Sequence, residues 1–340
     1  MRKLAVLALT GLLAAGLLSS CGDDDSSDPT PVDQLEVVRS ALDEYMSPTT
    51  MVPVITAQTL FDNLNDGNTA NDPYVLCVRT ADDYAKGHVP GARNINWRLI
   101  ADGTNLATLP TDRQIAVYCY TGHTGAVATT CLNALGYNAV NMKHGIMAWT
   151  RDATVRAQSP FTDATDAHDY PTETTVNTLT TTYEMPELDV TTSEDPEEII
   201  RAAAGAYVAN ASISPTITAQ AVFDNLNDGN AANDYFVLSV RTAADYAKGH
   251  VPGAYNIFYK DIAKTENLEK LPTDKTIVVY CYTGHTGGVA TTALRMLGYS
   301  AVNMKYGIMA WTRDATVRAQ SPFTDATDAH DYPFNTGVNP

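Results

Sequence analysis

The chain has 340 residues, of which 44% are hydrophobic and 18% charged, and its formal net charge is −17. This length predicts two domains, each large enough for a core of its own, and the composition is that of a globular protein rather than a disordered one. The excess of acidic residues repels phosphate groups, which argues against nucleic acid as a partner and against membrane docking through charge alone.

The first residues are typical of an export signal. Met1-Arg2-Lys3 is basic, and Leu4 to Leu18 is an apolar stretch too short for a comfortable membrane span. The next residues, Leu18-Ser19-Ser20-Cys21, resemble the lipobox of bacterial lipoproteins. The resemblance implies a lipoprotein signal peptide over 1–20 and a lipid-modified Cys21, whereas the alternative is a plain secretory leader with an incidental cysteine.

This interpretation also predicts a location. Residues 21–32 are acidic and contain serine and proline, so we expect a flexible tether there. Acyl chains on Cys21 would hold the protein in the bacterial cell envelope, at the periplasmic face or the outer membrane, through the lipid anchor only.

An internal duplication organises the rest of the chain. Cys119 and Cys281 are 162 positions apart, as are Trp149 and Trp311, and this offset holds without a gap from Arg39 to Pro171 of the first copy. A period of this length indicates two whole domains. We predict the first domain over 33–171 and the second over 194–340, with a threonine-rich linker over 172–193.

Apolar periodicity and turn signals predict the same order of elements in each copy. In the first copy we expect a helix over 35–45, a helix capped by Thr56, strands over 74–78, 115–118 and 139–142, a helix over 126–135, and a closing helix that begins near Met147. Strands that alternate with helices predict an α/β fold, in which each repeat is a parallel sheet flanked by helices on both faces.

The strand over 115–118 leads into Cys119, a short loop with a glycine and then a helix, and the second copy repeats this order around Cys281. Reactive groups gather at the carboxyl ends of such strands, and the first turn of a helix favours negative charge. We therefore predict that both thiols are partly ionised and reactive. The alternative is a buried, inert cysteine, but the recurrence of the residue at the same junction favours reactivity.

Two further cysteines are not repeated. Cys77 is matched by Ser239, and Cys131 by Ala293, so the chain is a poor candidate for a disulfide scaffold. We expect Cys131 to be a packing residue on the helix that follows Cys119. Cys77 ends the preceding predicted strand, and it either packs there or approaches Cys119 as a resolving thiol.

Several motifs resemble the rhodanese superfamily in a tandem arrangement. They are Val78-Arg79, Gly87-His88-Val89-Pro90-Gly91-Ala92, the loop from Cys119 to Thr124, and Gly145-Ile146-Met147-Ala148-Trp149, each repeated in the second copy. The resemblance implies a thiosulfate sulfurtransferase-like enzyme without cofactor or metal. Its catalytic residues would be Cys119 and Cys281, which would take sulfur from a small anionic donor as persulfides and pass it to a thiophilic acceptor or acceptor protein.

The resemblance also implies a substrate-binding loop in each half, formed by Tyr120, Thr121, Gly122, His123, Thr124, Gly125, Tyr282, Thr283, Gly284, His285, Thr286 and Gly287. Rhodaneses frequently carry a basic residue where this chain has Thr124, so the identity of the sulfur donor stays open. His123 is the one loop residue able to carry charge near neutral pH, and it either assists the donor anion or points at solvent. Tyr120 either screens the sulfur from water or packs at the rim.

Other polar residues are expected to be structural. We predict local hydrogen bonding for His88 and His250, and ion pairs of Arg79 with Asp83 and of Arg241 with Asp245. The acidic segment over 163–169, repeated over 325–331, is expected to pack against its own domain or at the seam between the domains rather than to bind a cation.

The sequence also bears on two rival functions. A phosphatase of related fold would need an arginine six residues after the cysteine, where Gly125 and Gly287 stand. The better alternative is a membrane-tethered sulfur carrier or a scaffold of an envelope complex, with little turnover of small molecules.

Overall fold

The computed structural model describes residues 32–49 and 51–338. The predicted signal peptide, Cys21 and nearly all of the predicted tether lie outside these residues. Within the described ranges, every helix is too short or too polar to cross a lipid bilayer.

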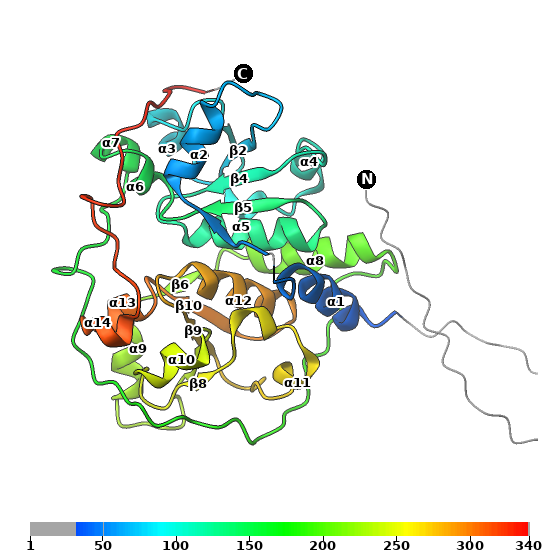
Figure 1. The fold of residues 1–340 in the computed structure, drawn as a ribbon. Coiled ribbons are helices and arrows are strands. Elements are labelled where there is room, and N and C mark those ends of the chain that lie inside the picture. Colours follow the sequence, from blue (N-terminus) through cyan, green and yellow to red (C-terminus); the bar gives the residue numbers. More distant parts are fainter. Residues whose placement is uncertain (1–31, 50, 339–340) are drawn as a thin grey trace, which may run out of the picture. The chain divides into compact units, whose positions relative to one another are not determined.

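The two copies of the repeat fold into the same series of elements (Figure 1). The first half comprises α1 (Gln34–Met46), β1 (Val54–Ile55), α2 (Ala57–Leu64), β2 (Tyr74–Cys77), α3 (Ala81–Lys86), β3 (Arg93–Asn94), the 3₁₀ turn η1 (Trp97–Leu99), α4 (Gly103–Leu106), β4 (Ile115–Tyr118), α5 (His123–Ala134), β5 (Ala139–Met142), α6 (Ile146–Trp149) and α7 (Ala153–Arg156). The second half comprises α8 (Pro196–Val208), β6 (Thr216–Ile217), α9 (Ala219–Leu226), β7 (Phe236–Ser239), α10 (Ala243–Ala247), β8 (Tyr255–Asn256), η2 (Tyr259–Asp261), α11 (Thr265–Leu268), β9 (Ile277–Tyr280), α12 (His285–Met296), β10 (Ala301–Met304), α13 (Ile308–Trp311) and α14 (Ala315–Arg318).

Each half contains a five-stranded parallel sheet. The strand order is β1-β5-β4-β2-β3 in the first sheet and β6-β10-β9-β7-β8 in the second. The side chains of β4 alternate between two hydrophobic clusters, with Val117 in one and Ala116 and Tyr118 in the other. Both faces of the sheet are therefore covered, which confirms the predicted α/β fold with two repeated domains.

Local sequence signals explain several of these elements. Val38, Leu42 and Met46 follow one another at four-residue intervals on α1, and all three are buried. The Thr56 hydroxyl accepts the backbone N–H of Thr59 at 3.0 Å, which makes Thr56 the N-cap of α2 as predicted.

The two halves share the largest hydrophobic cluster, and each half has a further cluster on the other face of its sheet. The largest cluster contains residues of both halves, including Leu132 on α5 and Leu294 on α12. These two helices pack against each other closely, and a Cβ at Gly288 would lie only 2.9 Å from the Cβ of Ala126. The interface between the halves therefore includes the first turns of α5 and α12.

The segment that follows each half's last helix crosses to the other half. The backbone N–H of Tyr170 donates to Trp311 O at 3.1 Å, and the Tyr332 N–H donates to Trp149 O at 3.1 Å. Figure 1 shows the C-terminal segment, in red, running from α14 to the vicinity of α6 and α7. We call residues 160–171 and 322–333 the exchanged tails.

The acidic groups of the exchanged tails neutralise arginines of the opposite half. Asp163 accepts from the Arg318 guanidinium at 2.7 Å, and Asp169 accepts from Arg313 at 2.8 Å. Asp325 and Asp331 pair with Arg156 and Arg151 in the same way. Of the two expected placements, packing against the segment's own domain is wrong, whereas the seam between the domains is consistent with carboxylates that bind arginines of the other half. In these ion pairs the carboxylates bind guanidinium groups of the chain itself rather than a metal cation.

The predicted linker over 172–193 runs along the second half. Glu173 and His250 exchange both backbone hydrogen bonds, at 3.0 and 2.9 Å, and the N–H of Tyr183 donates to Glu269 O at 2.7 Å. Close to the end of the linker, Gln34 of α1 donates to Thr191 O at 2.6 Å. The linker is therefore bound along its course rather than free.

Candidate active site

Cys119 lies directly after β4, as the sequence predicts, but α5 begins four residues later, at His123, which is three residues before the predicted start. The backbone N–H of Gly122 donates to Cys119 Sγ at 3.1 Å, and that of Gly284 donates to Cys281 Sγ at 3.1 Å. Both glycines have φ of +92°, a conformation that favours glycine and turns the N–H toward the sulfur. Each thiol therefore faces a backbone donor at the start of a helix.

Both thiols are enclosed by protein. Cys119 and Cys281 are each 1% exposed and belong to the core cluster that also contains Val78 and Val117. A sulfur donor therefore reaches Sγ only when neighbouring groups move.

The closing motif of each half holds the loop through its backbone. The N–H of Ile146 donates to Cys119 O at 2.9 Å, and that of Met147 donates to Tyr120 O at 3.3 Å. Gly145 has φ of +56°, and a Cβ there would lie 2.5 Å from Cys119 O. Gly307 has the same conformation and the same contact with Cys281 O. The glycine is therefore required by close backbone approach.

A buried asparagine on the sheet supports the loop, and no motif of the sequence analysis included it. Asn141 on β5 donates through Nδ2 to Gly122 O at 2.8 Å, and Asn303 on β10 donates to Gly284 O at 2.8 Å. A Cβ at Gly125 would lie 2.3 Å from Asn141 Oδ1, which explains why a residue without a side chain follows Thr124. The available signal was one polar residue, identical in both copies, at the end of an apolar buried strand.

Tyr120 and Tyr282 lie at the rim of their loops. The Tyr120 hydroxyl donates to Asp83 Oδ2 at 2.5 Å, and Tyr282 donates to Asp245 at 2.6 Å. Burial, and next the bond to Asp83, raise the pKa of Tyr120 above its ordinary value, so it is a neutral phenol near pH 7. Thr124 and Thr286 are partly exposed on the first turns of α5 and α12.

The histidine of each loop is buried, neutral and bound to the other half. His123 Nε2 accepts the backbone N–H of Tyr306 at 3.0 Å, and its Nδ1 lies 2.7 Å from Thr121 Oγ1. Because Nε2 accepts, the proton is on Nδ1, which donates to the threonine. Burial lowers the pKa of His123 well below its ordinary value. Both expected roles, a charged aid to the donor and a solvent-facing side chain, are therefore wrong.

His285 makes the equivalent contacts. Its Nε2 accepts the N–H of His144 at 2.9 Å, and its Nδ1 lies 2.8 Å from Thr283 Oγ1. Burial, with a smaller contribution from Lys143, lowers the pKa of His285 to about 3.

We expect these buried imidazoles to make the protein less stable as the pH falls below about 6.5, the pKa of an unperturbed histidine. The unfolded chain binds their protons near that pH, whereas folded His285 does so only at about 3. Between these two pH values the unfolded state holds more protons than the folded state. The free energy of unfolding therefore decreases as the pH is lowered, by up to about 1.4 kcal/mol per pH unit for each histidine. Urea unfolding from pH 7.5 to 4.5 measures the effect.

The control is a variant with His123→Gln and His285→Gln, which do not titrate. Its free energy of unfolding should depend less steeply on pH than that of the parent. The positively charged neighbours Lys143 and Lys305, and the buried His144, remain in both proteins. Parallel curves would contradict the assignment of neutral, buried imidazoles.

Arg79 does not pair with Asp83, contrary to prediction. Its guanidinium is fully buried and donates to Val155 O at 2.7 Å, to Gly87 O and to Cys77 Sγ at 3.3 Å. Asp83 pairs with Lys86 instead. In the second half Arg241 donates to Val317 O and Gly249 O, while Asp245 pairs with Lys248.

The unrepeated cysteines lie apart from the loop thiols. Cys77 belongs to the cluster on the sheet face opposite that of Cys119, where it contacts Arg79, so the placement favours packing over a resolving role. Cys131 is fully buried, and burial raises the pKa of its thiol to about 12, as fits a packing residue. His88 Nδ1 donates locally to Tyr84 O at 3.0 Å, and its ring stacks on the Tyr84 ring, which confirms its structural role.

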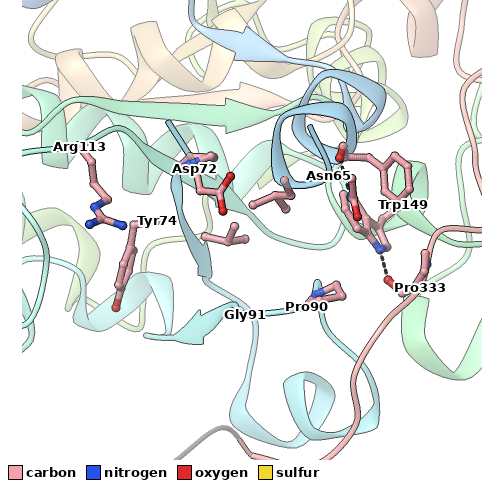
Figure 2. Close-up of a pocket in the computed structure, with 12 residues that line it drawn as sticks. Asn65, Asp72, Tyr74, Pro90, Gly91, Arg113, Trp149 and Pro333 are labelled. Atoms are coloured by element: carbon pink, nitrogen blue, oxygen red, sulfur yellow. Dashed lines mark hydrogen bonds between the residues drawn. The ribbon is translucent and has the colours of Figure 1, made fainter. Parts of the chain in front are cut away.

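A hollow of the first half lies away from the loop. A pocket of about 420 Å³ is lined by Tyr74 at the start of β2, Pro90, Trp149 and Pro333 of an exchanged tail (Figure 2). Figure 2 shows the Trp149 indole donating to Pro333 O, at 2.8 Å. The second half has a matching pocket of about 470 Å³ beside Trp311. The first pocket includes the start of β2, whereas Cys119 follows the end of the parallel strand β4. Neither pocket is lined by a residue of the candidate loops.

Comparison with known proteins identifies a family model that matches both halves, and relatives that match about a third of the chain. The family model described as Rhodanese-like domain matches residues 56–152 and 218–314. A sulfurtransferase from Allochromatium vinosum is 31% identical over 102 residues, which are 30% of this chain and 91% of that protein. The probable adenylyltransferase/sulfurtransferase MoeZ of Mycobacterium tuberculosis is 35% identical over 106 residues, which are 31% of this chain and 26% of the relative. The chain thus spans about a quarter of the length of that relative.

Solved structures also match. A rhodanese-like domain protein from Staphylococcus aureus is 27% identical, with a TM-score of 0.26 and coverage of 28% of this chain and 88% of the other. Thiosulfate sulfurtransferase from Pseudomonas aeruginosa is 14% identical, with a TM-score of 0.30 and coverage of 89% of this chain and 49% of the other.

Proposed function

The chain belongs to the rhodanese-like domain family, with two such domains in tandem, and on that premise we propose that each half transfers sulfane sulfur through the cysteine of its loop. The observation that carries the proposal is the N–H of Gly122, or Gly284, directed at the thiol sulfur from the start of a helix. A hydrogen bond to sulfur favours the thiolate, which is the nucleophilic form.

The proposed reaction has two steps. The Cys119 thiolate attacks the outer sulfur of thiosulfate or a similar donor, a new S–S bond forms, and the old S–S bond breaks with its electron pair leaving on sulfite. The enzyme is then a cysteine persulfide anion. In the second step the nucleophilic acceptor, such as cyanide or a thiolate, takes the outer sulfur and returns the electron pair of the new S–S bond to Cys119.

The loop supplies its electrostatic help without a cation. Cys119 to Gly125 contains no lysine or arginine, and His123 is neutral. Stabilisation of the persulfide therefore depends on backbone N–H groups and on the N-terminus of α5. Tyr120, Thr121 and Thr124 form the rest of the proposed binding loop, with their counterparts in the second half.

Burial of the thiols supports a second candidate. With each cysteine residue 1% exposed, small donors have poor access, which favours a sulfur carrier or scaffold that exchanges sulfur with a protein partner able to open the loop. We propose for either function that the protein is anchored in the bacterial envelope by lipid on Cys21. The intact mass of the native protein tests that modification.

Incubation of the purified protein with thiosulfate is expected to add one sulfur, about 32 Da, to each of the peptides that contain Cys119 and Cys281. Cyanide should then remove it as thiocyanate. Mass spectrometry of the peptides and a colorimetric thiocyanate assay measure the two steps.

The same experiment separates the candidates. Labelling with steady thiocyanate production supports the enzyme, whereas labelling without turnover supports the carrier. Failure of thiosulfate and of a low-molecular-weight persulfide to label either peptide would contradict both.

A further inference from the structure

The two candidate loops are bound to each other by a reciprocal pair of histidines. His123 of the first loop accepts the N–H of Tyr306, and His285 of the second accepts the N–H of His144. The two imidazole rings lie nearly parallel, with their centroids 6.1 Å apart. Both histidines are buried, at 5% and 4% exposure, so each bond is shielded from water.

The backbone that each histidine holds is the segment that supports the opposite cysteine. His144 directly precedes Gly145 and Ile146, which contact and hydrogen-bond Cys119 O. Tyr306 precedes Gly307 and Ile308 in the same way, and Ile308 N–H donates to Cys281 O at 2.9 Å. A displacement of His285 is therefore transmitted through three residues to the first cysteine.

Each histidine also contacts the glycine that donates to the opposite thiol. A Cβ at Gly122 would lie 2.3 Å from His285 Nε2, and a Cβ at Gly284 would lie 2.3 Å from His123 Nε2. His285 thus lies against both backbone groups that set the geometry of Cys119: the donor to its sulfur and the segment bound to its carbonyl.

We propose that His285 is a positioning residue for Cys119, and His123 for Cys281, so that each loop is completed by the opposite half. The two candidate sites are consequently coupled, and a change at one loop alters the thiol of the other. For sulfur transfer this inference rests on the proposed function, but the coupling itself can be measured with any thiol reagent.

The two nitrogens of His285 make separable contacts. Nε2 contacts the opposite half, whereas Nδ1 donates to Thr283 of its own loop. The carbonyl of glutamine reaches the position of Nε2, so His285→Gln retains the acceptor for His144 N–H and loses the local bond. The amide of asparagine reaches the position of Nδ1, so His285→Asn retains the local donor and loses the bond to the opposite half.

The test uses a Cys281→Ser background, in which Cys119 is the remaining loop thiol. Alkylation of the Cys119 peptide by iodoacetamide is followed by mass spectrometry from pH 5.5 to 10, together with persulfide formation from thiosulfate and the melting temperature. We expect His285→Asn to raise the midpoint of the alkylation profile by about one pH unit and to slow persulfide formation by about tenfold, because the donor to Sγ is displaced. His285→Gln should stay within about twofold of its parent.

The outcomes are distinct. Equal midpoints for the parent, Asn and Gln proteins would overturn the coupling, as would equal shifts in both variants. If the alkylation midpoints of the Asn and Gln variants differ but the parent forms no persulfide, the proposed function is refuted and the coupling is retained.

If His285→Asn does not fold, the imidazole of His285 is observed directly in the Cys281→Ser protein by nitrogen-15 NMR. Alkylation of Cys119 should shift the Nε2 resonance of His285, although the two residues belong to different halves. An unchanged resonance would overturn the inference.

Discussion

Serine at both Cys119 and Cys281 is expected to reduce sulfur transfer by more than about a thousandfold while the fold is retained. A serine hydroxyl still accepts the N–H of Gly122 or Gly284, so the loop keeps its support. It is not ionised near neutral pH and does not form a persulfide, so the covalent step is lost. Thiocyanate production and the melting temperature measure the two parts of the prediction.

The repeat supplies matched controls for this experiment. Cys77→Ser and Cys131→Ala place in the first half the residues that the second half has as Ser239 and Ala293. Both changes should leave thiocyanate production within about twofold, because neither thiol belongs to the proposed mechanism. Retention of activity by the double serine variant would contradict the site assignment, and loss of activity with Cys77→Ser would restore the resolving role of Cys77.

Alanine at Gly145 is expected to cost at least about 3 kcal/mol of unfolding free energy and to misplace Cys119. The backbone at Gly145 has φ of 56° and ψ of −147°, which L residues rarely adopt, and the new Cβ would lie 2.5 Å from Cys119 O. Relief of this contact requires a shift of backbone, since the contacted atom is a backbone oxygen. Urea unfolding measures the cost, and alkylation of the Cys119 peptide reports the loop.

The control variants are Gly67→Ala and Gly136→Ala. These glycines also have positive φ, 81° and 84°, but a Cβ at either meets nothing within 4 Å. Each of these two substitutions should lower the free energy of unfolding by only about 1 kcal/mol, because of conformational strain, and leave Cys119 unaffected. If Gly145→Ala is no worse than Gly136→Ala, the close approach does not hold the loop.

The sequence alone predicted those features that depend on neighbouring residues. The strands over 115–118 and 139–142 have the predicted bounds, because β-branched and apolar runs between turn signals are local information. The position of Cys119 between a strand and a helix follows from the same pattern. The cap at Thr56 was equally accessible, since it needs only the residues up to Thr59.

The remaining features depend on contacts between the halves. The partner of His123 is 183 residues away, and no local pattern distinguishes a histidine that faces solvent from one that accepts a distant backbone N–H. The exchanged tails pose a sharper problem, because duplication gives both halves the same arginines. Asp163 is equally complementary to Arg156 and Arg318, so side-chain chemistry does not decide between its own half and the other.

The exchange of tails has a consequence for how such a chain arises. Every contact that Tyr170 and Asp163 make in the second half has a twin made by Tyr332 and Asp325 in the first. A self-complementary arrangement of this kind is what twofold symmetry produces between identical subunits. The single chain therefore has the arrangement of a twofold-symmetric dimer, and residues 172–193 connect its two equivalent halves.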